Sequence, residues 1–232
     1  MVTTEVEQKP IRIREFALVL AVAFSSTLLA SIYVLIGGKI PHDPASAGLR
    51  VLNFMVYEII AILVLIYVLY RQNRTLEDLG FVFSRNDILL SIGLSMLAYG
   101  AYYVSYFQIY HAYTFVTGHT MPAPQHSSAI AEGLTFGSIL FVMLNPFYEE
   151  LIARAYVMTE LGFFTNSKVI AILGSVALQT AYHLYQGFPY ALSLAATFLI
   201  FSLYYATAKR VWPIVLAHFY FDLFALVAAA YR

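Results

Sequence analysis

The sequence contains no cysteine and few charged residues. The absence of cysteine from its 232 residues excludes disulfides, thiolate metal ligands and cysteine nucleophiles. Only 11% of the residues are charged, whereas a soluble domain has about 25%. In contrast, 61% are hydrophobic and the mean hydropathy is +0.74. This composition predicts an integral membrane protein, and the balance of 13 basic and 13 acidic residues gives no support for a nucleic-acid partner.

The long apolar segments predict an all-α fold. A membrane-spanning helix needs about 20 mostly apolar residues, and the candidates are 16–36, 51–70, 87–112, 131–163, 168–186, 189–208 and 211–231. We therefore predict a polytopic transmembrane helical bundle of about seven to eight spans, with residues 1–232 as a single integral membrane domain. The fourth segment is too long for one plain crossing, and Asn145–Pro146 interrupts it. It is either a kinked helix or two helices, which would give eight spans.

The distribution of Lys and Arg predicts the topology. With the N-terminus inside, nine basic residues fall in inner segments: Lys9, Arg12, Arg14, Arg71, Arg74, Arg85, Lys168, Lys209 and Arg210. Three fall in outer segments: Lys39, Arg50 and Arg232. This bias predicts a cytoplasmic N-terminus and an external C-terminus. A polytopic chain without a targeting sequence is expected in the plasma membrane of a prokaryotic cell.

Three charges lie together in the fourth apolar segment, in the pattern Glu149-Glu150-x-x-x-Arg154. A charge at membrane depth costs about 2.5–3.5 kcal/mol even on the lenient insertion scale. Glu150 and Arg154 are four residues apart, so they share a helix face and can pair. Glu149 points about 100° away and meets only Ala153 one turn on, which leaves it unpaired. Such a carboxylate suits a general base acting on water; the alternative is a packing ion pair with a spare glutamate facing a wet cavity.

Two further polar pairs lie in later apolar segments, namely Gln179 with His183 and His218 with Asp222. Each pair alone could be purely structural, although a carboxylate that holds a ring N–H also sets the tautomer of a histidine. Counted at 1.5 Å per residue from the inner helix ends, Glu149 lies about 24 Å deep, His183 about 22 Å and Asp222 about 18 Å. The overlapping depths favour one buried polar site built by three helices.

In their order and intervals, these motifs resemble those of the CPBP family. Its members are the CAAX-processing and bacteriocin-processing intramembrane proteases, also called the type II CAAX prenyl endopeptidase or Abi family. The family carries Glu-Glu-x-x-x-Arg, then Phe-x-x-x-His, then His-x-x-x-Asn/Asp on transmembrane helices. The resemblance covers roughly residues 130–231, which we expect to form the catalytic core. Gln179 replaces the Phe of the second motif, and Asp222 stands where prenyl-processing members typically have Asn.

The resemblance implies a role for each residue. Glu149 and His183 would activate water for attack on a peptide carbonyl, and Glu150 with Arg154 would orient the helix. His218 and Asp222 would stabilise the oxyanion. An ionised Asp cannot donate a hydrogen bond, so either Asp222 is protonated or it holds His218 while the other ring nitrogen donates. We favour the second arrangement.

The leading interpretation is therefore a glutamate-type intramembrane endopeptidase that needs no cofactor. Its expected partners are the lipid bilayer and a peptide or lipidated protein substrate. One alternative is a zinc metalloprotease in which His183, His218 and a Glu hold the metal. The sequence contains no H-E-x-x-H motif, however. The other alternative is a transporter or non-enzymatic membrane partner that uses the polar site as a proton relay or structural network.

Overall fold

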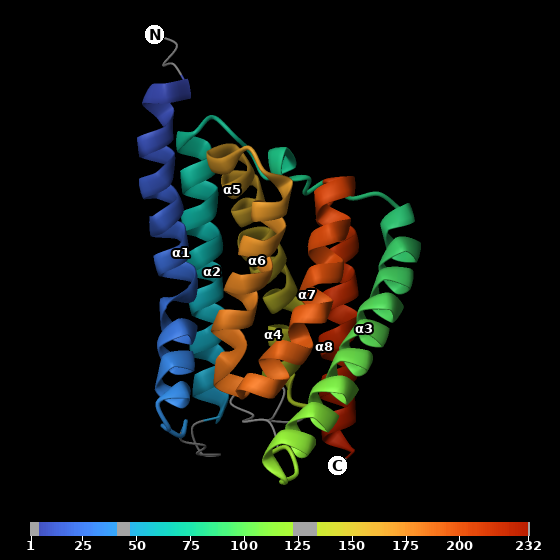
Figure 1. The fold of residues 1–232 in the computed structure, drawn as a ribbon. Coiled ribbons are helices and arrows are strands. Elements are labelled where there is room, and N and C mark those ends of the chain that lie inside the picture. The colour runs from blue at the N-terminus through green and yellow to red at the C-terminus, as the bar shows by residue number, and fades with distance from the viewer. Residues whose placement is uncertain (1–4, 41–46, 123–133, 232) are drawn as a thin grey trace.

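The structure is a computed structural model that describes residues 5–40, 47–122 and 134–231. Over these ranges the chain is helical and contains no β-strand, which confirms the all-α fold class. The helices are α1 (Glu5–Leu35), α2 (Ala47–Arg71), η2 (Glu77–Leu79), α3 (Asn86–Thr117), α4 (Phe136–Glu149), η4 (Glu150–Tyr156), α5 (Val157–Thr165), α6 (Lys168–His183), η5 (Leu184–Gln186), α7 (Phe188–Ala208) and α8 (Trp212–Ala230). The α-helices are arranged as a bundle, with the two termini at opposite ends (Figure 1).

Five helical segments of the described chain are long and apolar enough to cross a membrane: α1, α2, α3, the segment Phe136–Thr165 and α7. Large apolar side chains on them face outward, such as Leu29 (66% exposed), Leu63 (58%) and Phe107 (64%). Apolar surface of this kind suits lipid, and the protein is an integral membrane protein. Two predicted spans, 168–186 and 211–231, correspond to the shorter helices α6 and α8. The number of spans thus stays a prediction.

The fourth predicted span is one continuous helical segment. Asn145 and Pro146 lie inside α4, and α4, η4 and α5 follow one another without a gap. The alternative of two helices separated at Asn145–Pro146 is therefore wrong in the described part of this segment. The irregularity comes later, because η4 is a π-helix, in which bonds run from residue i to i+5. The helix type thus changes between Glu149 and Glu150.

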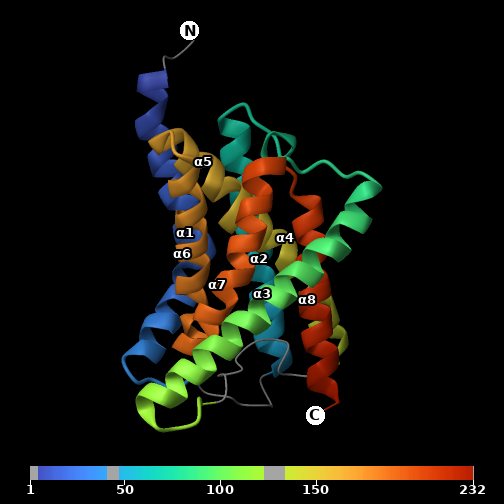
Figure 2. The same cartoon turned by 45° about the vertical axis from the view of Figure 1, so that its right-hand side comes forward.

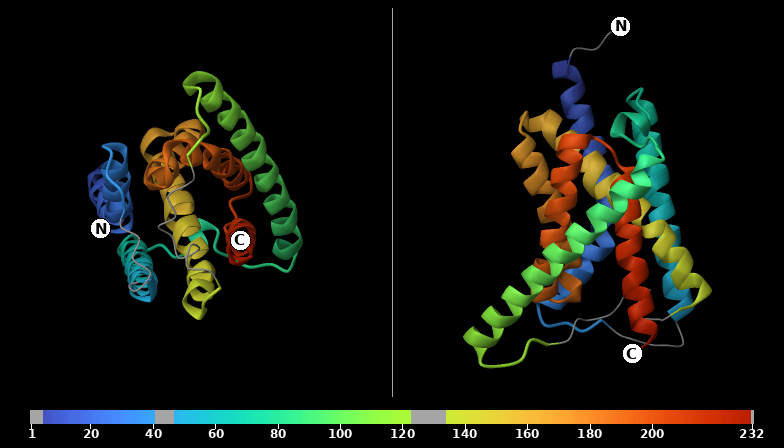
Figure 3. Two further views of the ribbon diagram at one scale, coloured as in Figure 1. Left: turned by 90° about the horizontal axis from the view of Figure 1, so that it is seen from below. Right: turned by 90° about the vertical axis from the view of Figure 1, so that its right-hand side faces the viewer.

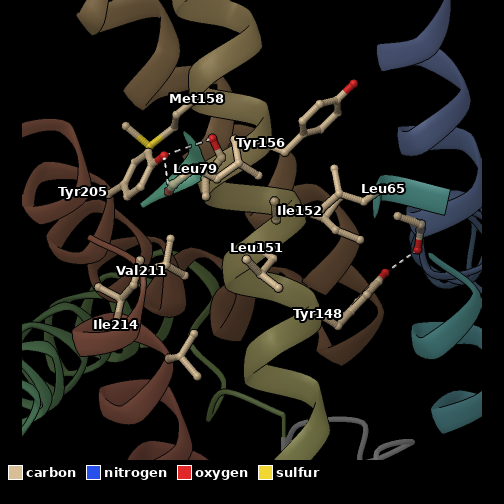
Figure 4. Packing of buried hydrophobic residues seen from close by; sticks show 14 of the residues in the cluster. Leu65, Leu79, Tyr148, Leu151, Ile152, Tyr156, Met158, Tyr205, Val211 and Ile214 are labelled. Carbon is tan, nitrogen blue, oxygen red and sulfur yellow. Dashed lines mark hydrogen bonds between the residues drawn. The ribbon is translucent and has the colours of Figure 1, made fainter. Parts of the chain in front are cut away.

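The segment α4–η4–α5 occupies the interior of the bundle. In the end-on view it passes between other helices, while α3 lies along the outside (Figure 3). Helix α4 packs against α2 and α8, and α3 crosses obliquely over α7 and α8 (Figure 2). All seven residues of η4 are buried. Leu151, Ile152 and Tyr156 enter the apolar core, and the Tyr148 hydroxyl donates to the backbone carbonyl of Ala23 on α1 (Figure 4).

Two tertiary contacts fasten the end of the bundle near η2. Gly80 ends η2 with a φ of 81°, as expected for a short helix closed by glycine. A Cβ there would lie 2.0 Å from the Lys209 carbonyl oxygen between α7 and α8, so only glycine permits this approach. Glu160 on α5, which is fully buried, accepts from Arg12 of α1 at 2.8 Å and from Arg74 at 2.6 Å. The ion pairs of Glu160 thus join α5 to α1 and to the chain that follows α2.

Candidate active site

The three motifs lie on elements that meet around η4. The first motif covers the end of α4 and the start of η4, the second lies on α6, and the third lies on α8. Helix α6 contacts η4, and α4 contacts α8. Four of the predicted site residues are buried, namely Glu149, Glu150, Arg154 and Asp222, and so is Gln179 of the second motif. The other two, His183 and His218, are half-buried. The fold brings all of them into two adjoining groups.

Arg154 is the centre of the first group. Its side chain is fully buried and pairs with Glu150, as the spacing of four residues predicts. Its Nη1 atom donates to the Phe198 carbonyl at 2.8 Å and to Ser202 Oγ at 2.5 Å, both on α7. Its Nη2 atom donates to Gln179 Oε1 at 2.8 Å. One guanidinium thus ties η4 to α6 and α7, with every donor nitrogen matched to an oxygen.

Glu150 has a second partner on α8. His218 Nδ1 lies 2.9 Å from Glu150 Oε1, while Arg154 holds both carboxylate oxygens. The Glu150 carboxylate is therefore fully occupied by groups of the protein. Such a buried group is stabilised by its partners and is unavailable to act on a substrate.

Glu149 belongs to the second group and has different surroundings. It is 6% exposed, and its Oε2 atom accepts a hydrogen bond from the Tyr182 hydroxyl at 2.8 Å. In the described ranges it makes no ion pair with Lys, Arg or His. It lines a cavity of about 60 Å³ bounded by α1, α2, α4 and α6, which His183 also lines. One water needs roughly 15 Å³ by this measure, so the cavity has room for a reacting water beside Glu149.

His183 has a defined tautomer. Its Nδ1 atom lies 2.9 Å from the backbone carbonyl of Gln179, and a carbonyl can only accept, so Nδ1 carries the proton. The other nitrogen, Nε2, is then the basic one in the neutral ring. His183 therefore brings a hydrogen-bond acceptor to the wall of the cavity that contains Glu149.

The structure corrects the expected arrangement of His218 and Asp222. Asp222 Oδ2 lies 3.5 Å from His218 Nε2, and the opposite ring nitrogen faces Glu150. The expectation that one nitrogen remains free to donate to an oxyanion is therefore wrong in this conformation. The reason is the approach of η4 to α8, which the spacing within α8 could not reveal. Asp222 Oδ2 also accepts from Asn145 Nδ2 at 3.4 Å, and Asn145 lines the cavity.

Three residues at this site escaped the sequence reasoning: Glu58, Asn145 and Tyr182. In the sequence, Asn145 stands out only as a helix interruption beside Pro146, and no pattern singles out Tyr182. Glu58 carried a usable signal, because it is a carboxylate inside the predicted span 51–70. It is 5% exposed and lines the same cavity as Glu149.

The carboxylates and histidines of the site do not converge on one point among the described residues. Over the described ranges, no three His, Asp or Glu side chains are placed to hold one metal ion. His218 has carboxylates at both ring nitrogens, and His183 Nδ1 is bound to a carbonyl. The zinc set of His183, His218 and a Glu is thus not assembled in this arrangement.

These observations define the class of protein: an all-helical membrane protein with a buried site of carboxylates, histidines and an arginine. Residues 131–224 match the family model described as type II CAAX prenyl endopeptidase Rce1-like. The match confirms the resemblance to the CPBP family over this region, which is less than half of the chain and contains all three motifs. The family is one of proteases, which are hydrolases. No curated protein and no solved structure matches the chain.

Proposed function

We propose that this protein is an intramembrane endopeptidase that hydrolyses a peptide bond of a membrane-associated or lipidated substrate. One observation carries the proposal: Glu149 and His183 line the same cavity, whereas the adjacent Glu150 is neutralised by Arg154 and His218. This contrast supports a structural role for Glu150 and a reactive role for Glu149. This division is what a glutamate-type hydrolase requires, and the match to a protease family agrees with it.

In the proposed reaction, Glu149 acts as general base. Its carboxylate takes a proton from water, and the resulting hydroxide attacks the carbonyl carbon of the scissile peptide. His183 accepts a hydrogen bond from the same water at Nε2 and so orients it. Glu149 then gives its proton to the leaving nitrogen as the C–N bond breaks. The Tyr182 hydroxyl holds the Glu149 carboxylate in place.

We propose that the oxyanion donor is Asn145. Both nitrogens of His218 face carboxylates. The Asn145 amide borders the cavity, and its contact to Asp222 is long, at 3.4 Å. A side-chain amide is a suitable donor to a developing oxyanion. His218 and Asp222 would then contribute to the oxyanion site indirectly: Asp222 contacts both the Asn145 amide and His218, and so holds Asn145 in place.

The role of Asn145 predicts a defect in kcat. Asn145→Leu keeps a similar shape but removes the amide donor, and loss of one such donor costs about 10²–10³ in kcat. We expect KM to change little, because the donor acts mainly in the transition state. Steady-state kinetics on a peptide cleaved by the wild type would measure this. A change confined to KM would contradict the assignment.

The endopeptidase proposal can be tested with purified protein in liposomes. A panel of membrane-associated peptides, with and without a prenyl group, would be incubated with the wild type and with Glu149→Gln. Mass spectrometry should detect a cleaved peptide bond for the wild type alone. Equal cleavage by the two proteins, or cleavage by neither, would contradict the enzyme hypothesis and favour the transporter or non-enzymatic partner alternative.

The same assay separates the cofactor-free mechanism from the zinc alternative. We propose that no metal takes part, so activity should persist in excess chelator and purified protein should contain less than a stoichiometric amount of zinc. Loss of activity in chelator that zinc restores would favour the metalloprotease. We further propose a cytoplasmic N-terminus, because of the distribution of Lys and Arg, and a location in the plasma membrane of a prokaryotic cell, as expected for a polytopic chain without a targeting sequence.

A further inference from the structure

The cavity beside Glu149 is lined by aromatic rings as well as by acids. Six of its lining residues are aromatic: Phe54, Tyr57, Phe141, Tyr148, Tyr182 and Tyr185. Two are carboxylates, Glu58 and Glu149. Among the described residues that line it, none is Lys or Arg. Aromatic faces and carboxylates both attract cations, so these eight lining residues all favour a positively charged ligand.

Glu58 lines the cavity but has no role in the proposed mechanism. It lies on α2 and is 5% exposed, and its Oε2 atom has no hydrogen-bond partner in the described part of the protein. Residues four positions away on the same helix are Phe54 and Ile62, which offer no charge. A buried carboxylate that lacks a donor is unfavourable.

The other buried glutamates differ from Glu58 because each has a partner. Glu15 accepts from Gln72 at 2.9 Å, and Glu160 accepts from Arg12 and Arg74. Glu149 accepts from Tyr182, and Glu150 is held by its network. The fold therefore supplies donors to its buried carboxylates as a rule. The exception at Glu58 lies in the wall of a cavity, where a ligand can supply the donor.

We propose that the part of this cavity beside Glu58 is a binding subsite for a cationic side chain, lysine or arginine, of the substrate peptide, with Glu58 as its ion-pair partner. The inference rests on the proposed endopeptidase function and names a feature of its substrate. A cavity of about 60 Å³ accommodates the charged end of such a side chain. The rings of Phe54 and Tyr57, one turn and one residue before Glu58 on α2, border the same space.

The test compares two peptides that differ in one charge. Membrane-associated peptides would carry either lysine or the uncharged, similarly long norleucine at one position at a time, scanned along the peptide. Their affinities would be measured on Glu149→Gln, which is expected to bind without cleaving. At one position we expect lysine to bind at least about tenfold more tightly, as befits a partly desolvated charge pair. Adding Glu58→Gln should reduce that ratio to below about threefold, because the pair is lost.

A matched control is Glu77→Gln in the same background. Glu77 is an exposed carboxylate on η2 outside the cavity lining, so its removal should leave the lysine-to-norleucine ratio unchanged. Thermal melts would establish that each variant is folded. The readout is binding, so the subsite is tested even if no peptide is cleaved. Absence of cleavage would contradict the endopeptidase proposal but not the subsite.

Two results would overturn the subsite. One is equal affinity for lysine and norleucine at every position. The other is a lysine preference that persists unchanged in Glu58→Gln. A further comparison uses cleavage: if Glu58→Gln slows kcat for both peptides equally and leaves the affinity ratio intact, Glu58 acts in proton transfer instead, and the cation subsite is wrong.

Discussion

Glu149→Gln is expected to reduce peptide-bond cleavage by about 10²–10⁴-fold, the usual contribution of a general base. Glutamine has nearly the same shape but cannot take a proton from water. Its side-chain oxygen can still accept from the Tyr182 hydroxyl, which donates to Glu149 at 2.8 Å. The stability of the protein should therefore change little. Initial rates in liposomes and thermal melts in detergent measure the two effects separately.

The control for Glu149→Gln is again Glu77→Gln. It removes one carboxylate from an exposed position on η2 and should leave both rate and melting temperature close to wild type. If Glu149→Gln keeps the wild-type rate, Glu149 is not the base and the water-activating role fails. If its melting temperature drops strongly, the loss of activity results from unfolding. Glu149 would then be needed for stability, contrary to the prediction.

Arg154→Ala should have the opposite signature, a large loss of stability. The guanidinium is fully buried and donates to Glu150, Gln179, Ser202 and a backbone carbonyl. Without it, the Glu150 carboxylate keeps His218 as its one side-chain partner among the described residues. Breaking a buried pair in this way costs about 3–5 kcal/mol, which corresponds to a fall of roughly 10 °C in melting temperature for a chain of this size.

Arg71→Ala provides the matched control for this prediction. Arg71 also faces a glutamate, with its Nε atom 3.6 Å from Glu15 Oε1, but its side chain is 53% exposed. An exposed pair contributes about 0–1 kcal/mol, so this variant should melt close to wild type. Thermal unfolding of both variants in one detergent gives the comparison. Equal melting temperatures for Arg154→Ala and wild type would remove the argument that the pair holds the site together.

Several features of the site were predictable because they depend on local geometry. A spacing of four residues sets Glu150 against Arg154, and this pair is present. The same spacing brings Asp222 to within 3.5 Å of His218. The common depth of the three motifs on their helices predicted one site, and the elements that carry them do meet around η4.

Other features could not be predicted, because their partners come from distant parts of the chain. Tyr182 reaches Glu149 from a position 33 residues away, and His218 reaches Glu150 from 68 residues away. The second contact changed the interpretation of His218, since it occupies the nitrogen that was expected to be free. No motif marked Ser202 or the Phe198 carbonyl as ligands of Arg154.

The change of helix type within the fourth span is also a tertiary feature. The sequence pointed to Asn145–Pro146 as the irregular position, because proline lacks the backbone N–H that a helix interior uses. The helix instead accommodates Pro146 and changes to a π-helix at Glu150. The stretch that changes is fully buried against neighbouring helices, so its packing is available only in the assembled bundle.

The apolar segments and the spacing of the polar residues within them are enough to identify an all-helical membrane protein whose last hundred residues carry three polar motifs of a protease family. Helical periodicity and the cost of charge in an apolar segment are local properties, and they suffice for that conclusion. The packing of the helices is needed to know which carboxylate is neutralised, which nitrogen of each histidine is occupied, and that Glu58 borders the cavity with Glu149. Those outcomes depend on which helices pack together, because hydrogen bonds and burial are settled by neighbours in space.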